Sequence, residues 1–255
     1  MSPPGRRRPR PLVPFAEGVV TAIAGGALAA SVGVLVARPV PAGFVGAVNG
    51  AVSGARGVYR WRRPEGWVAF VLDSTWGLAM TTVAVGAHAV AATQQGQGGY
   101  VEPLSRRQNR HVYERGVRVR RGFVLSLGNT ISQVGASVRT SPPRLRMVTD
   151  HEDVHVWQAR WLGPIFPVLY AGWSVAGGVV GIAVWAARRR SEPLGQVVET
   201  CAYYLNPLEW WAYSREDRWP PPGKLAGLGW RRPAARAFSV GGGGRWRAAS
   251  PSTPP

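Results

Sequence analysis

The chain of 255 residues is long enough for one domain, or for a small domain combined with membrane spans. Its 31 basic and 13 acidic residues give a formal charge of +18, which predicts affinity for anionic surfaces, either lipid headgroups or nucleic acid. The single cysteine, Cys201, excludes an internal disulfide framework and a cysteine-based zinc finger.

The N-terminal part of the chain changes from basic to apolar. Residues 1–14 are rich in proline and arginine, which predicts a disordered basic arm. The apolar run over residues 18–37 has about the length of a membrane span and is longer than the apolar core of a typical signal peptide. We expect it to be a retained first span, with small residues that allow close helix packing.

A second apolar segment, residues 43–55, carries glycines at a regular spacing. Gly46, Gly50 and Gly54 fall on one face of a helix, where glycine lets two backbones approach closely within a membrane. The segment is short for a span, so it either crosses or forms a helical hairpin with the first run. The ridge could also drive self-association, and the alternative is a glycine-rich surface segment.

The apolar run over residues 66–92 has the length of a full span and completes a predicted transmembrane region over residues 15–93. It contains Asp73 and, near its far end, His88. An ionisable residue within a span is a candidate functional residue. The alternative favoured for Asp73 is that local hydrogen bonds or a neighbouring arginine satisfy its carboxylate.

Residues 94–162 have the composition of a folded, water-exposed unit. The alternation over 117–120 and the β-formers over 123–131 predict a small β-hairpin region. Ser141 followed by two prolines predicts the start of a helix that runs to about Trp161 and ends at Gly163-Pro164.

Residues 163–217 are predicted to hold one more span and two short helices. The apolar run over 165–187 ends in Arg188-Arg189-Arg190, which is typical of a cytoplasmic anchor. Residues 192–217 are expected to form two helices that are separated at Asn206-Pro207. Residues 218–255, rich in proline, glycine and arginine, are predicted to be a disordered tail.

The fold class predicted from these segments is mainly α, a multi-pass transmembrane helical bundle in the cell membrane. It has four spans if 43–55 crosses, with 94–162 outside, and three spans if it does not, with 94–162 cytoplasmic. The four-span arrangement places Arg188-Arg189-Arg190 inside, as the positive-inside rule prefers.

The predicted helix of residues 141–161 carries the pattern HExxH. His151 and His155 are four residues apart, so on a helix both imidazoles face one cation. Glu152 lies beside them, where it could take a proton from a water that the metal activates. The pattern predicts a zinc site with Glu152 as the general base. The alternative is an amphipathic helix whose histidines only form hydrogen bonds.

Two imidazoles leave a zinc shell incomplete, so a third ligand is expected from a later helix. Two copies of Glu-x-x-Ala-Tyr follow, beginning at Glu199 and at Glu209. Asn206 is a good N-cap and Pro207 a good first residue, which places Glu209 in the first turn of a new helix. Glu209 is the preferred ligand and Glu199 the alternative; either glutamate could instead pair with one of the many arginines.

These motifs together resemble a known pattern. The run from His151 to Gln158, followed by Asn206-Pro207-x-Glu209-x-x-Ala212-Tyr213, resembles the gluzincin-like pattern of several bacterial HExxH families. The resemblance implies that Glu209 completes the metal site. Over about residues 18–220 the chain also looks like an uncharacterised family of actinobacterial multi-pass membrane proteins. The resemblance is specific for a metal site and carries no substrate.

Two functions remain open at this stage. The first is a membrane-embedded zinc hydrolase, most simply a peptidase, with a strand of 123–131 pairing with an extended peptide or protein substrate and Tyr203 or Tyr213 polarising an oxyanion. The alternative is a non-catalytic membrane protein whose metal site is structural or vestigial and whose arginines bind anionic lipid. Nucleic-acid binding is not expected, because the arginines cluster at span ends and no recognition helix or stacking pattern is present.

Overall fold

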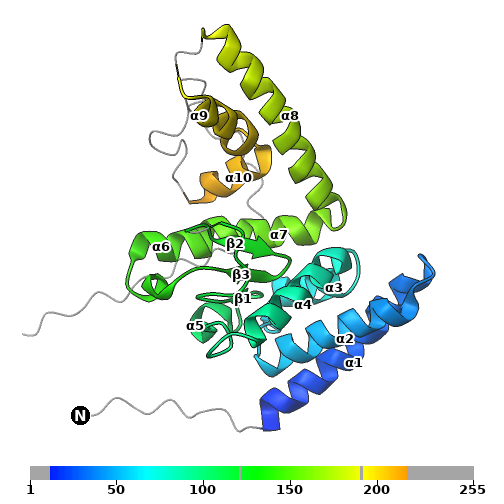
Figure 1. Cartoon of the computed structure of the whole chain (residues 1–255). Coiled ribbons are helices and arrows are strands. Elements are labelled where there is room, and N and C mark those ends of the chain that lie inside the picture. Colours follow the sequence, from blue (N-terminus) through cyan, green and yellow to red (C-terminus); the bar gives the residue numbers. More distant parts are fainter. Residues whose placement is uncertain (1–11, 121, 190–191, 217–255) are drawn as a thin grey trace, which may run out of the picture.

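The computed structural model describes residues 12–120, 122–189 and 192–216. The described residues are mainly helical, as the sequence predicts, and the predicted β-hairpin region is part of a small three-stranded sheet. Figure 1 shows a central layer with the sheet, a helical hairpin on one side of it and a second helical arm on the other. The disorder predicted for 1–11 and for the C-terminal tail lies outside the described residues.

The helical hairpin consists of α1 (Leu12–Val34) and α2 (Pro39–Ala55). Helix α1 begins at Leu12, so the disordered arm predicted to reach residue 14 is too long, and it ends before the predicted residue 37. The glycine ridge of α2 is buried against α1, because a Cβ at Gly50 would overlap the main chain of Thr21. The hydroxyl of Thr21 donates to the Gly50 carbonyl at 2.6 Å across the contact. The ridge therefore packs α2 against α1 within one chain.

The span predicted over residues 66–92 is two helices, α3 (Pro64–Ser74) and α4 (Leu78–Ala92), whose axes differ by 89°. The predicted apolar run is therefore broken by a sharp bend. The end of another helix, α7 (Asp153–Leu162), lies against the break. The indole of Trp76 donates to the Trp161 carbonyl at 2.9 Å. A Cβ at Gly77 would overlap the Leu72 carbonyl oxygen at the end of α3, so the tight break requires glycine there.

Asp73, at the end of α3, is held by an arginine, as the favoured alternative predicts. Arg160 Nε lies 2.8 Å from Oδ1 and Nη2 lies 2.9 Å from Oδ2, and both side chains are buried. The Tyr59 hydroxyl and the Asn129 amide also donate to Oδ2. Burial of a charge is costly unless it is paired and hydrogen-bonded, and this carboxylate is both. The pairing fixes α7 on the bend between α3 and α4.

The sheet has three short strands, β1 (His111–Val112), β2 (Leu125–Leu127) and β3 (Thr130–Ser132), in the order β1-β3-β2. Strands β2 and β3 form the predicted antiparallel hairpin, and β1 pairs parallel to β3. Residues 117–120, predicted to be part of the hairpin, form no strand. The short helix α5 (Glu102–Ser105) precedes β1, and a 3-10 turn (Ala136–Arg139) follows β3. The core behind the sheet consists of Val101, Val112, Ile131, Val134, Val138, Val148 and Val156.

The HExxH helix begins as predicted. Ser141 is the N-cap of α6 (Pro142–Arg146), and its hydroxyl accepts from the Arg144 amide. A π-helical segment, Met147–Glu152, then leads into α7. Such widened turns inside α-helices frequently lie at functional sites. Gly163 ends α7 with a φ of +51°, a conformation that favours glycine.

The second arm begins with α8 (Ile165–Ala187) and returns through α9 (Leu194–Glu199) and a π-helical segment (Thr200–Tyr204) to α10 (Pro207–Arg215). The returning segment packs closely on α8 at Gly177 and Gly181. A Cβ added at either glycine would meet the main chain of the returning segment. The break predicted at Asn206-Pro207 separates the two return helices. Figure 1 shows α10 reaching back to α7.

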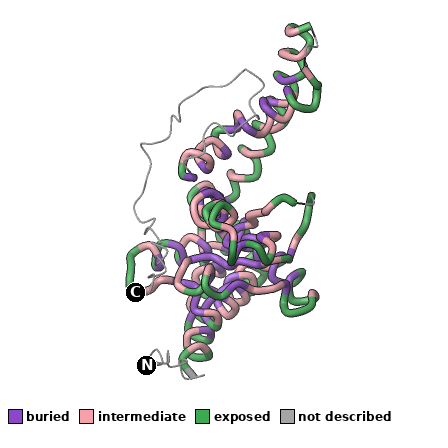
Figure 2. The backbone as a smooth tube through the Cα atoms, turned by 90° about the vertical axis from the view of Figure 1, so that its left-hand side faces the viewer, coloured by how far each residue is buried: buried purple, intermediate pink, exposed green. Residues whose placement is uncertain are grey.

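Two of the described helices are long and apolar enough to cross a membrane, Val13–Val34 and Ile165–Ala187. The bent pair of α3 and α4 makes a third if it forms one span, whereas α2, with 17 residues, is too short to qualify. Figure 2 shows buried residues gathered in the central layer and a largely exposed far part of the second arm. The exposed apolar residues of α8 include Val168, Val175, Val179, Val180 and Ile182. An exposed apolar surface of this kind indicates association with a membrane.

Candidate metal centre

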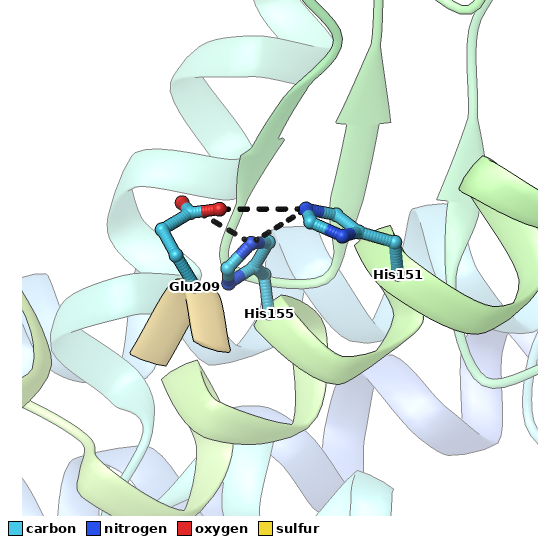
Figure 3. A group of neighbouring side chains, drawn as sticks. All are labelled: His151, His155 and Glu209. Atoms are coloured by element: carbon cyan, nitrogen blue, oxygen red, sulfur yellow. Dashed lines mark hydrogen bonds and ion pairs between the residues drawn. The ribbon is translucent and has the colours of Figure 1, made fainter. Parts of the chain in front are cut away.

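Three predicted residues meet between α10 and the HExxH helix. His151, His155 and Glu209 are all buried, and each offers a ligand atom within 4.8 Å of the others. Figure 3 shows the two imidazoles and the carboxylate pointing toward one another from the two elements. The structure therefore brings together a group that could hold a metal ion, and the group includes Glu209.

The ligand atoms are close enough to share one metal ion. The two Nε2 atoms are 3.3 Å apart; His151 Nε2 lies 3.5 Å from Oε2 of Glu209, and His155 Nε2 lies 3.5 Å from Oε1. Ligands about 2.1 Å from a tetrahedral zinc ion are about 3.4 Å from each other. Within the described part of the chain, no group donates a hydrogen bond to Glu209 Oε2, although this atom is buried. A metal ion between the three residues could take this oxygen as a ligand.

The local sequence explains how Glu209 reaches the histidines. The side chain of Asn206 accepts from the Leu208 amide at 3.0 Å, and Pro207 occupies the first helical position. This N-cap starts α10 two residues before Glu209, so the carboxylate lies in the first turn, where the positive end of the helix dipole favours it. Glu199, the alternative ligand, is half-buried at the end of α9 and is not part of the group.

The charges of the group are strongly coupled in the absence of a metal. Burial by itself would lower the pKa of His155, but the Glu209 carboxylate outweighs burial and raises it to about 9. Burial would likewise raise the pKa of Glu209, and the two imidazoles instead hold it well below its usual value. The metal-free group is thus an ion pair in which a proton occupies the place of a cation.

Glu152, the predicted general base, is buried, and its position is fixed by the sheet. The Ser126 hydroxyl, from β2, donates to Glu152 Oε2 at 2.8 Å and also contacts the Glu152 carbonyl at 3.3 Å. The carboxylate is close enough to contribute to the raised pKa of His155. The sequence marks 123–131 as a strand region but gives no signal for the role of Ser126.

Several residues that sequence reasoning did not single out surround the group. The Tyr170 hydroxyl, from α8, donates to Glu209 Oε1 at 2.6 Å. Gln158 contacts His155 Nδ1 at 2.8 Å, and Glu216 Oε2 lies 3.8 Å from His151 Nδ1. Only Gln158 could have been predicted from the sequence, because a residue three positions after His155 lies on the same face of the helix.

The remaining candidate residues lie around or away from the group. The Tyr213 ring packs on the His151 ring at 4.4 Å, whereas Tyr203 packs against Phe123. His88 is separate from the metal group. Its Nδ1 lies 2.8 Å from the Tyr113 hydroxyl, and its ring packs on that of His111.

Comparison of the chain with protein-family models, with curated proteins and with solved structures found no match.

Proposed function

We propose that this protein is a zinc-dependent hydrolase of the membrane and that its substrate is a peptide. The observation that carries the proposal is the convergence of His151, His155 and Glu209 at separations suited to zinc. Two histidines and one carboxylate are a ligand set typical of catalytic zinc, because three protein ligands leave one position open. When bound, zinc would lower the pKa of a coordinated water to about 7 and would polarise a carbonyl.

The chain's own residues supply the proton transfer. Glu152 precedes the second histidine by three positions, and Ser126 fixes its carboxylate. In this position Glu152 takes the proton of the attacking water and returns it to the leaving amine. Tyr170 and the first turn of α10 orient Glu209, so that the carboxylate keeps the direction that a metal ligand needs.

The sheet supports a peptide as the substrate. Strand β2 is an edge of the described sheet, and Ser126 connects it directly to Glu152. An extended peptide can pair with such an edge through main-chain hydrogen bonds. The peptide would then lie alongside the proposed general base.

The position of the group along α8 indicates where the bond would be cut. Tyr170 lies about 8 Å from the start of this helix, at a rise of 1.5 Å per residue, in a span whose apolar core is about 30 Å thick. The proposed zinc site is therefore near one end of the span. We expect cleavage of a peptide bond close to the membrane surface, with the arginines at the span ends contacting anionic lipid.

The direct test is metal analysis of the full chain purified in detergent, compared with His155→Ala and with the control His88→Gln. We expect one zinc per chain in the wild type and in the control, and none in His155→Ala. Wild type without bound zinc would remove the proposal.

A second measurement separates catalysis from a structural metal. Membrane-anchored fluorogenic peptides are incubated with the wild type and with Glu152→Gln. We expect cleavage by the wild type and loss of cleavage, with zinc retained, in Glu152→Gln. Zinc binding without any cleavage would favour the alternative, a membrane protein with a structural metal.

A further inference from the structure

Gln158 is fully buried on α7 and touches both elements of the metal group. Its amide contacts His155 Nδ1 at 2.8 Å on one side and the Leu208 carbonyl at 2.9 Å on the other. Leu208 immediately precedes Glu209 in the first turn of α10. One side chain thus connects His155 to the residue that precedes Glu209.

The Leu208 contact determines which way the amide points. A main-chain carbonyl can only accept a hydrogen bond, so the amide nitrogen of Gln158 must face Leu208 and donate to it. The amide oxygen then faces His155 Nδ1 and can only accept. His155 must therefore carry a proton on Nδ1.

The proton on Nδ1 determines which nitrogen of His155 can bind a metal ion. A proton fixed on Nδ1 leaves Nε2 as the ligand atom, and Nε2 is the nitrogen that faces Glu209 at 3.5 Å. The contact behind His151 is longer, because Glu216 Oε2 lies 3.8 Å from its Nδ1 and no hydrogen bond reaches that nitrogen among the described residues. Gln158 is thus the stronger of the two supports behind the imidazoles.

We infer that Gln158 is the positioning residue of the metal centre, which presents His155 Nε2 to the cation and holds α10 so that Glu209 meets it. This inference rests on the proposed zinc site. Replacing a residue that orients a metal-bound histidine typically lowers metal affinity about 10- to 100-fold. We expect a loss of about that size when Gln158 is replaced.

The test compares zinc affinity, measured by chelator competition, among the wild type, Gln158→Met, Gln158→Glu and Val156→Ala, all as full chains in detergent. Methionine removes both hydrogen bonds at nearly constant volume, so we expect a loss of about 10- to 100-fold. Glutamate keeps the acceptor for Nδ1 and loses the donor to Leu208, so its zinc affinity should lie between those of the wild type and the methionine variant.

Val156→Ala is the matched control, because Val156 is buried on the same helix but belongs to the core behind the sheet. We expect this variant to lower the unfolding temperature while its zinc affinity stays within about threefold of the wild type. A change of that size is smaller than the loss expected when a residue that orients a metal ligand is replaced. If zinc affinity followed unfolding temperature across all variants, Gln158 would be only a packing residue and the inference would fail.

A spectroscopic readout identifies the ligand atom itself. With 113Cd in place of zinc and 15N-labelled histidine, the wild type should show cadmium coupling to His155 Nε2. Four histidines in the chain keep the assignment simple. Gln158→Met should weaken that coupling or move it to Nδ1, and Gln158→Glu, which serves if the methionine variant does not fold, should retain it. Coupling to Nδ1 in the wild type would overturn the inference, whereas absence of metal from the wild type would overturn the zinc site itself.

Discussion

Arg160 and Asp73 form a two-pronged ion pair in which both side chains are almost completely buried, at 2.8 and 2.9 Å. The pair joins α7 to the end of α3, at the bend that divides the predicted span of residues 66–92. It therefore determines how the HExxH helix lies on the rest of the fold.

Replacement of one member of this pair should be costly. Asp73→Asn leaves the guanidinium of Arg160 buried without its counter-charge, and we expect a loss of about 3–5 kcal/mol in the free energy of unfolding. Denaturant titration of the detergent-solubilised protein measures the loss. The control is Arg106→Ala, which removes an exposed pair with Glu102 and should cost under about 1 kcal/mol. Equal losses in the two variants would contradict this role of the buried pair.

The two Glu-x-x-Ala-Tyr copies provide a matched comparison for the third ligand. Glu209→Gln removes the charge that faces both imidazoles, so zinc affinity should fall by at least about tenfold. Glu199→Gln should leave it unchanged, because Glu199 is outside the group. Chelator competition measures both variants. The opposite order of affinities would restore Glu199 as the ligand.

Zinc affinity should depend on pH through His155. Because the pKa of this imidazole is raised to about 9, a proton occupies it at neutral pH and must leave before a cation binds. We expect affinity to rise about tenfold per pH unit from about pH 7 and to level off near pH 9.

The metal-free protein should show the opposite dependence. A raised pKa stabilises the fold below the ordinary value of 6.5, and this contribution is lost as the pH rises through about 9. Thermal unfolding of the zinc-free protein at several pH values checks this sign. A flat profile in both measurements would mean that His155 and Glu209 are not coupled.

The α1–α2 contact predicts a difference between two glycine substitutions. In Gly50→Ala the new methyl group would meet the main chain of Thr21, so the helices must separate at a cost of about 1–3 kcal/mol. Gly86→Ala, inside α4, meets nothing within 4 Å and should be neutral or stabilising by up to about 1 kcal/mol through helix propensity. Unfolding midpoints distinguish the two, and equal midpoints would argue against tight packing of the ridge.

The sequence predicts the parts of the site that depend on local rules. The spacing of His151 and His155, the N-cap at Asn206 and the first-turn position of Glu209 are properties of single helices. The choice between Glu209 and Glu199 depends instead on the path by which α9 returns along α8. No local sequence pattern predicts that path. The preference for Glu209 agrees with the structure, because the N-cap Asn206 belongs to the Glu-x-x-Ala-Tyr copy that reaches the histidines.

The features that sequence reasoning missed arise from contacts between distant segments. The residue before the bend, Asp73, pairs with an arginine 87 residues later in the chain. The hydrogen bond from Ser126 to Glu152 likewise depends on how the sheet lies on the HExxH helix. The π-helical segment, Met147–Glu152, includes His151 and changes the local turn without changing the sequence spacing of the histidines, so periodicity does not reveal it.

The position of Glu209 beyond α8 has a consequence for biosynthesis. The histidines leave the ribosome first, and the carboxylate that completes their site follows only after the entire apolar helix and its return segment have been made. The three residues of the proposed zinc site can therefore meet only after α8 has been placed and the chain has folded back along it. An intermediate stalled before that point has both imidazoles but not Glu209, so it would lack the third ligand of the proposed zinc site.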